Sequence, residues 1–261
     1  AFPASRPPRR RANARCIRPL TAGAGPSASV TARPLMKQLV IATRREHVMT
    51  QATTAAATSQ DALNAVLVGA MPSQGSWSDE HYLWLTDRAR RLIEFTDGRV
   101  EVLPMPTERH QVILLFLYRL FFVHVQEPPS NGVVVTSGVR MRVREDKFRE
   151  PDLLLLRDRS DSRRRDRFWL GADLVAEIVS PDDPARDLVV KRADYAEASV
   201  PEYWIVDPDG ETVTVLTLVG DAYVEHGVFA RGDTATSYLL DGVAVDVGLL
   251  FDEAESGQAE S

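Results

Sequence analysis

The sequence predicts an α/β domain with a mixed central sheet, flanking helices and disordered termini. From Trp77 onward, helix-type and strand-type apolar patterns alternate along the chain. Two short continuous apolar runs, residues 151–156 and 174–179, are typical of central strands that are buried on both faces. A content of 44% hydrophobic and 26% charged residues is ordinary for a protein with a real core. The 261 residues fit one such domain with tails.

Residues 1–70 differ in composition from the rest of the chain. The first 45 residues contain ten Arg or Lys and no acid, and the whole stretch lacks periodic apolar structure. We expect it to be a disordered basic segment, because it cannot bury enough apolar surface. A targeting segment and translated sequence upstream of a later Met are both open interpretations. The folded domain is then expected over residues 71–251, followed by an acidic tail at 252–261.

Charge and cysteine content exclude several classes of protein. Residues 46–261 contain 21 basic and 37 acidic side chains, which gives this part of the chain a net charge of −16. Such a body is unlike a nucleic-acid binder that grips the backbone through a basic surface, so any such role needs a local patch or a metal. The single cysteine, Cys16, excludes an internal disulfide and a zinc site with two thiolates. No apolar run approaches 18 residues, so no transmembrane helix and no membrane partner are expected.

The first half of the domain contains two helices and a hairpin. Ser78 can cap a helix that begins with Asp79 and Glu80. Residues 91–95 and 100–103 form a predicted hairpin, because Asp97-Gly98 between them suits a tight turn. Residues 107–125 give the strongest helix signal, and apolar residues nearly surround that helix, which favours burial against a sheet. Its helically spaced apolar residues are Val112, Leu115, Phe116, Leu120 and Val123.

The second half is mainly strands. Strands are predicted at 132–137, 139–143, 151–156 and 174–179, with a charged loop at 157–167. A helix at 184–198 has Pro184 in its first turn. Two further strands, 202–206 and 212–218, are joined by a Pro-Asp-Gly turn, and residues 223–229 add an outer strand.

Two carboxylates interrupt the apolar strands. Asp152 and Glu177 each lie inside such a run, where a carboxylate loses several kcal/mol of hydration unless it is paired or bound to a metal. On neighbouring strands they would suit a divalent cation such as Mg²⁺, which takes oxygen ligands and keeps several waters. The alternative is that they lie at strand ends in solvent or pair with arginines.

Lys191 favours the first interpretation. Asp187, Lys191 and Tyr195 have i, i+4, i+8 spacing and share one helix face. If this helix packs on the sheet after Glu177, its ammonium can reach the two carboxylates. A cation there could hold an attacking water or offset charge on a pentacovalent phosphorus.

The order of these motifs resembles the Uma family of restriction-endonuclease-like proteins, within the PD-(D/E)XK nuclease superfamily. The resemblance covers about residues 77–229 and includes Pro151-Asp152, the run 177–181, Lys191 and the run 201–208. It implies a restriction-endonuclease-like fold in which Asp152 and Glu177 bind Mg²⁺ or Mn²⁺. It also implies that Glu94 is an additional metal-directed acid. Because Val179 occupies the position of the superfamily lysine, the resemblance implies that Lys191 replaces it.

Other polar and aromatic residues allow two interpretations each. His110 could contact phosphate or a metal-bound water, or it could cap or pack its helix. Arg140, Arg142 and Arg144 share a strand face and could grip a phosphate backbone, or they could be a solvated face. The pair at 203–204, Tyr-Trp, could stack on bases or fill the core.

Together these features predict a Mg²⁺-dependent endonuclease that hydrolyses phosphodiester bonds of nucleic acid, with DNA as the expected target and the cytoplasm as its expected location. A non-catalytic interaction module that keeps the nuclease scaffold is the alternative, favoured by the acidic body and by Val179. A third reading, an acid–base enzyme on a small molecule, needs an apolar ligand pocket. A homodimer is expected by analogy, because double-strand cutting commonly uses two copies.

Overall fold

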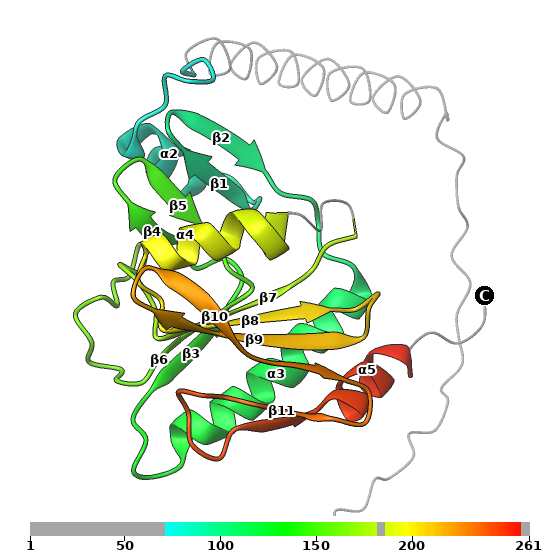
Figure 1. Cartoon of the computed structure of the whole chain (residues 1–261). Helices are drawn as coiled ribbons and strands as arrows, with labels where there is room; N and C mark the ends of the chain where they lie inside the picture. The colour runs from blue at the N-terminus through cyan, green and yellow to red at the C-terminus, as the bar shows by residue number, and fades with distance from the viewer. Residues whose placement is uncertain (1–70, 182–185, 257–261) are drawn as a thin grey trace, which may run out of the picture. The chain divides into compact units, whose positions relative to one another are not determined.

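The computed structural model describes residues 71–181 and 186–256 (Figure 1). The basic segment 1–70, Pro184 and the last five residues lie outside the described residues, so the predictions made for them stay predictions. None of the helices within the described ranges has both the length and the apolar content that crossing a membrane requires.

The central sheet has six strands in the order β10-β9-β8-β7-β6-β3. β7 and β8 run parallel, and every other neighbouring pair is antiparallel, which confirms the predicted mixed sheet. Both central apolar runs form adjacent strands, as predicted. The strands are β3 (Val133–Thr136), β6 (Leu153–Leu156), β7 (Leu174–Ile178), β8 (Glu202–Asp207), β9 (Thr212–Val219) and β10 (Ala222–Ala230).

A second sheet of four strands has the order β2-β1-β5-β4. Its strands are β1 (Ile93–Thr96), β2 (Arg99–Val102), β4 (Met141–Arg144) and β5 (Lys147–Arg149). The predicted hairpin β1-β2 is confirmed, and its turn residues Asp97 and Gly98 have φ values of 47° and 77°. β5 was not predicted, because its three residues, Lys-Phe-Arg, are too few to show a period.

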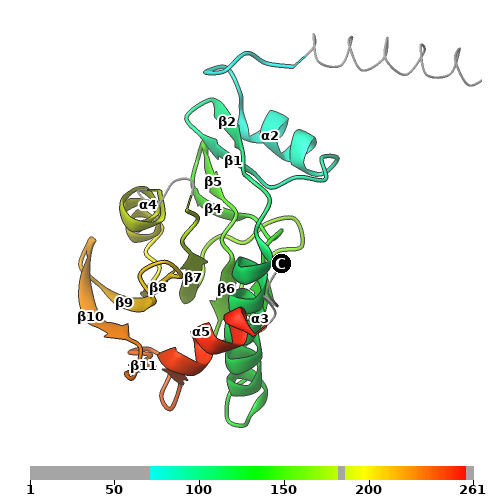
Figure 2. The ribbon, with the colours of Figure 1, turned by 90° about the vertical axis from the view of Figure 1, so that its right-hand side faces the viewer.

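Helices cover both faces of the central sheet (Figure 2). α3 (Glu108–Gln126) and α5 (Val247–Glu255) pack on the face that presents Leu153 and Leu155. On the opposite face Leu154 and Leu156 join a second core. That core includes Tyr195 of α4 (Lys191–Glu197), which follows a π-helical turn (Arg186–Val190). α2 (Asp79–Thr86) packs on the smaller sheet through Tyr82 and Leu83.

The buried face of α3 differs in part from the predicted one, since Val112, Phe116 and Leu120 pack against the core but are only partly buried. The helix buries Ile113, Leu114, Leu117, Phe121 and Val125, whereas Leu115 and Val123 of the predicted stripe are 52% and 55% exposed. Apolar residues occur nearly all round this helix, so their spacing alone could not select the face that meets the sheet.

The chain after β10 holds three further elements that the sequence did not indicate. β11 (Thr234–Thr236) and β12 (Ala244–Asp246) form a two-stranded ribbon, and α5 follows directly. α5 continues to Glu255 and buries Ala254. Residues 252–255 of the predicted acidic tail are therefore helical.

The N-cap of α3 sets up a stability prediction. Thr107 Oγ1 accepts a hydrogen bond of 3.2 Å from the backbone N–H of His110. Thr107→Ala leaves this donor without its partner and is expected to lower the free energy of unfolding by about 1 kcal/mol in urea denaturation. Thr234→Ala, on an exposed strand, is the control and should change it by less than about 0.5 kcal/mol. An equal loss in both variants would contradict the capping role.

Candidate active site

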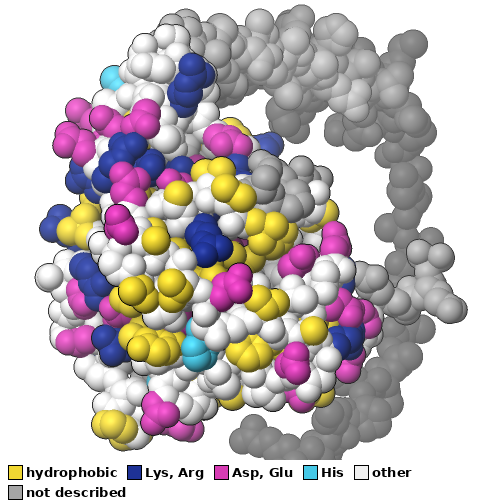
Figure 3. Space-filling model, in the orientation of Figure 1, with side chains coloured by type: hydrophobic (Ala, Val, Ile, Leu, Met, Phe, Trp, Pro, Cys, Tyr) yellow, Lys and Arg dark blue, Asp and Glu magenta, His cyan; other side chains and the backbone are white. Residues whose placement is uncertain are grey.

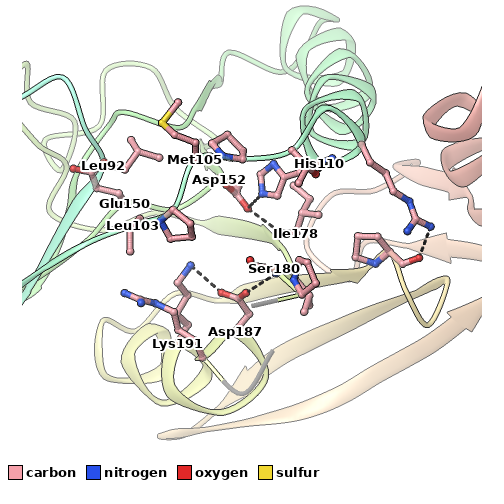
Figure 4. A pocket seen from close by; sticks show the side chains of 18 of the residues that line it. Leu92, Leu103, Met105, His110, Glu150, Asp152, Ile178, Ser180, Asp187 and Lys191 are labelled. Carbon is pink, nitrogen blue, oxygen red and sulfur yellow. Dashed lines mark hydrogen bonds and ion pairs between the residues drawn. The ribbon is translucent and has the colours of Figure 1, made fainter. Parts of the chain in front are cut away.

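A cavity of about 530 Å³ lies where the central sheet meets the starts of α3 and α4 (Figure 4). Asp152, directly before β6, lines it together with His110 of α3. The opposite wall carries Asp187 of the π-helical turn and Lys191 of α4. Elements that are far apart in the sequence thus bring their polar side chains to one place.

Asp152 and Glu177 are neighbours across β6 and β7. The register pairs Leu153 with Ala176, so Asp152 and Glu177 occupy the next pair of positions. The backbone N–H of Asp152 donates to Glu177 Oε2 (3.3 Å), and that of Ile178 donates to Asp152 Oδ2 (2.9 Å). The predicted convergence on adjacent strands is confirmed, and neither side chain pairs with an arginine in the described residues.

Lys191 contacts Glu177 of this pair, as its spacing predicted, but makes no ion pair with Asp152 within the described residues. Its Nζ lies 2.9 Å from Glu177 Oε1 and 2.9 Å from Asp187 Oδ1. The Tyr195 hydroxyl donates to the same Glu177 oxygen. Asp187, Lys191 and Tyr195 therefore share one face across the junction of the π-helical turn and α4, and that face meets the end of β7.

The electrostatics of the cluster are dominated by burial. Burial raises the pKa of Glu177 well above its usual range, and the charges of Asp152 and Asp187 add to this against the opposing charge of Lys191. Burial also acts to raise the pKa of Asp152, but hydrogen bonds from His110 and the Ile178 N–H, with the charge of Lys191, hold it below its usual value. Glu177 and Asp187 thus contact one ammonium group, whose charge also acts on Asp152.

His110 contacts the carboxylate of Asp152. Its Nε2 lies 3.0 Å from Asp152 Oδ2, and the Ser137 hydroxyl donates to Asp152 Oδ1 (3.3 Å). His110 Nδ1 is buried without a hydrogen-bond partner in the described residues. The structure thus gives His110 a polar contact that neither sequence interpretation specified, and that contact fixes the Asp152 carboxylate.

Glu94 does not line the cavity, and two arginines hold its carboxylate. It is 2% exposed, and its Oε2 lies 2.5 Å from Arg186 and 3.6 Å from Arg149. Burial alone would raise the pKa of Glu94, but the charges of Lys191, Arg149 and Arg186 hold it below its usual value. The structure does not bring Glu94 to the cavity wall with Asp152. To act there as a metal ligand, it would have to exchange Arg186 for the ion.

Arg140, directly before β4, and Arg142 and Arg144 of β4 each pair with an acidic side chain. Arg140 pairs with Asp87 (2.9 Å), and Arg142 pairs with Asp79 (2.8 Å). Arg144 pairs with both Asp97 and Glu197. On the face shown in Figure 3, basic side chains are likewise interspersed with acids rather than gathered into a patch. These contacts favour a structural role over a phosphate grip.

Three further residues settle or extend the sequence analysis. Tyr203 and Trp204 are fully buried, so they fill the core and are not available to stack on bases. Glu150, which the sequence analysis missed, lines the cavity at 5% exposure, and its Oε2 has no hydrogen-bond partner in the described residues. Burial raises the pKa of Glu150 to about 7. Its position two residues before Asp152, across a proline, was the one available signal.

The donor set decides which metal the site could take. Residues 71–181 and 186–256 hold no group of three or more His, Cys, Asp or Glu side chains placed to bind a metal. A closed zinc site therefore does not fit. Mg²⁺ commonly uses one or two carboxylates and keeps waters, so Asp152 and Glu177 fit it, and the excess of carboxylates over ammonium groups leaves charge for a cation to neutralise.

Comparison with known proteins places the chain in a family. Residues 79–248 match the model of the Uma2 family, described as "putative restriction endonuclease". The fold is similar to the crystal structure of a "putative nuclease belonging to DUF820" from Anabaena variabilis, at 18% sequence identity and a TM-score of 0.58. That match covers 68% of this chain and 99% of the other. No curated protein matches the sequence. Because this match covers more than half of the chain, the chain belongs to the Uma2 family.

Proposed function

We propose that this protein is a Mg²⁺-dependent nuclease that hydrolyses phosphodiester bonds of nucleic acid. The observation that carries the proposal is the meeting of Asp152, Glu177 and Lys191, with Lys191 Nζ 2.9 Å from Glu177 Oε1; Asp152 and Lys191 line the cavity, and Glu177 lies buried behind its wall. The description of the Uma2 family and that of the Anabaena structure support the same reaction class.

Each side chain has a distinct role in this proposal. Asp152 and Glu177 would hold Mg²⁺, which supplies Lewis-acid polarisation of a phosphoryl oxygen when bound. Lys191, set between two carboxylates, keeps its proton and acts as a cation that orients water and offsets charge on phosphorus. Glu94 is an auxiliary acid. Its carboxylate pairs with Arg186, and its negative charge helps Lys191 to keep its proton.

A cleavage panel tests the proposal. Duplex DNA, single-stranded DNA and RNA are incubated with the protein in Mg²⁺, Mn²⁺ or EDTA, and products are resolved on denaturing gels. We expect cleavage of at least one substrate that depends on the divalent ion, with DNA as the preferred target. Asp152→Asn purified in parallel excludes a contaminating nuclease. No cleavage under any of these conditions would reject the proposal.

Measurements of metal and substrate binding distinguish two other candidate functions from the nuclease. A non-catalytic interaction module predicts no heat of Mg²⁺ or Mn²⁺ binding in calorimetry of the full chain, whereas the nuclease predicts one site. The apolar wall of the cavity favours a third candidate, an acid–base enzyme on a small molecule with the His110–Asp152 pair as its base. That enzyme would bind its substrate equally well in EDTA.

His110 provides a prediction within the proposed function. His110→Ala removes the donor that fixes Asp152 Oδ2, so we expect cleavage to fall about 10- to 100-fold and the Mg²⁺ concentration for half-maximal rate to rise. His226→Ala, whose ring lies on the surface beside Thr236, is the matched control and should leave both values unchanged. If the rate fell with the Mg²⁺ dependence unaltered, a positioning role through Asp152 would be wrong.

A further inference from the structure

The ion pair between Arg186 and Glu101 lies between two cavities. Both side chains line the cavity beside Asp152, and both also line a second cavity of about 700 Å³, together with Glu94. Glu94 and Glu101 are directly opposite each other on β1 and β2. Arg186 Nη2 lies 2.5 Å from Glu94 Oε2, and its Nη1 lies 2.5 Å from Glu101 Oε1. One guanidinium group therefore borders both cavities and holds two carboxylates.

The two carboxylates differ in how readily Arg186 can exchange them. The Glu94 side chain is 2% exposed, and a buried carboxylate that loses its cation is strongly penalised. The Glu101 side chain is 64% exposed, and an ion pair with such a partner contributes only about 0–1 kcal/mol, because water solvates the carboxylate when the pair opens. A phosphate group that enters from solvent can therefore displace Glu101, while Glu94 keeps the guanidinium in place.

Charge favours one direction for a polyanionic strand that lies beside Asp152. Six carboxylates and three Lys or Arg side chains line the first cavity, whereas three carboxylates and three arginines line the second. Of the cations in the first cavity, Lys191 is 7% exposed and is held by Asp187 (Figure 4). Arg109 donates to a backbone carbonyl after β8 (2.6 Å). A strand meets less repulsion toward the second cavity, and on that path it passes Arg186.

We propose that Arg186 binds a phosphate of the nucleic-acid substrate where the two cavities meet, and that this phosphate takes the place of Glu101. This inference rests on the proposed function, because it takes the strand to be held beside Asp152. A guanidinium group presents a planar fork of N–H donors that matches the oxygens of a phosphate. Glu94 then acts as a positioning residue, which orients Arg186 toward the strand instead of binding the metal.

Oligonucleotide binding tests the proposal without requiring cleavage. Fluorescence anisotropy of a labelled single-stranded DNA and of its duplex is measured with the full chain, in EDTA and in Ca²⁺, at a series of salt concentrations. We expect Arg186→Met to weaken binding about tenfold and to reduce the slope of log affinity against log salt by about one. Arg186→Lys keeps the charge, so it should preserve the slope while losing part of the affinity. Arg119→Met, at an exposed arginine that lines neither cavity, should change neither value.

Glu101 gives an expected result of the opposite sign. Glu101→Gln removes the carboxylate that competes with phosphate, so binding should become about two- to fivefold tighter. Glu108→Gln, at another exposed residue of the first cavity, corrects for the general loss of negative charge and should have a smaller effect. In Arg186→Met, the added change Glu101→Gln should do no more than Glu108→Gln does. Additive effects of Arg186→Met and Glu101→Gln would overturn the exchange.

The outcomes separate this inference from the nuclease proposal. With Mg²⁺, Arg186→Met should raise KM about tenfold and change kcat less, because the bound phosphate is not the hydrolysed one. Cleavage by the wild type, with binding and KM unaltered in Arg186→Met, would keep the nuclease and reject the site. Binding that depends on Arg186 in a protein that cleaves nothing would support the site and reject the nuclease. No binding of either DNA, or a loss confined to Arg109→Met, would overturn the phosphate site.

Discussion

Asp152→Asn is expected to lower Mg²⁺-dependent cleavage by about 10²- to 10³-fold, because it removes a negative charge where the cation and the transition state need it. Asparagine keeps the size of the side chain, and its carbonyl oxygen can accept from His110 Nε2 and the Ile178 N–H, which both meet Asp152 Oδ2, while its NH₂ group faces the Ser137 hydroxyl. The measurement is the initial rate on a fluorescent oligonucleotide with saturating Mg²⁺.

The control for this variant is an acid-to-amide change remote from the cavity. Glu253→Gln, on the exposed side of α5 where Glu253 pairs with Arg119, should retain full activity. Calorimetry should show that Asp152→Asn also loses its heat of Mn²⁺ binding while thermal unfolding stays cooperative. Glu177→Gln is expected to behave in the same way. Full cleavage by Asp152→Asn would contradict the assignment of Asp152 to the reaction.

The strands that hold the site were predictable because both faces of the central sheet are buried. Leu153 to Leu156 alternate between the two cores, so every position is apolar and the run stands out in the sequence. The orientation of α3 could not be predicted, because apolar residues occur nearly all round this helix as well. β5, β11 and β12 have three residues each, which is too short for a period, and their pairing partners are needed to define them.

For the site, sequence reasoning found the residues whose burial demands an explanation. A carboxylate in an apolar strand must have a partner, which identified Asp152 and Glu177, and helical spacing identified Lys191. The sequence did not indicate which side chain each of these residues contacts. Glu94 contacts Arg186, which lies 92 positions later in the chain, and His110 contacts Asp152, which lies 42 positions later. Such contacts depend on how the two sheets and α3 pack, not on any local pattern.

Lys191→Met is expected to have the second large effect, because it lowers both the stability and the cleavage activity of the protein. The side chain is 7% exposed between Glu177 and Asp187, so its removal leaves two buried carboxylates without their cation. We expect the free energy of unfolding to fall by about 3 kcal/mol, since breaking a buried ion pair is strongly destabilising. Cleavage should fall by about 10²-fold, because the charge beside phosphorus is lost. Urea denaturation and initial rates measure the two effects separately.

A double variant distinguishes the structural from the catalytic role of this lysine. In Lys191→Met/Asp187→Asn the unpaired charge of Asp187 is absent as well, and Glu177, whose pKa burial raises well above its usual range, can take up a proton. Replacing a buried ion pair by neutral groups is often close to neutral in stability. We therefore expect the double variant to regain most of the lost stability and none of the lost activity. Arg119→Met, which removes an exposed partner of Glu253, serves as the control for both measurements. Recovery of activity together with stability would mean that Lys191 only supports the fold.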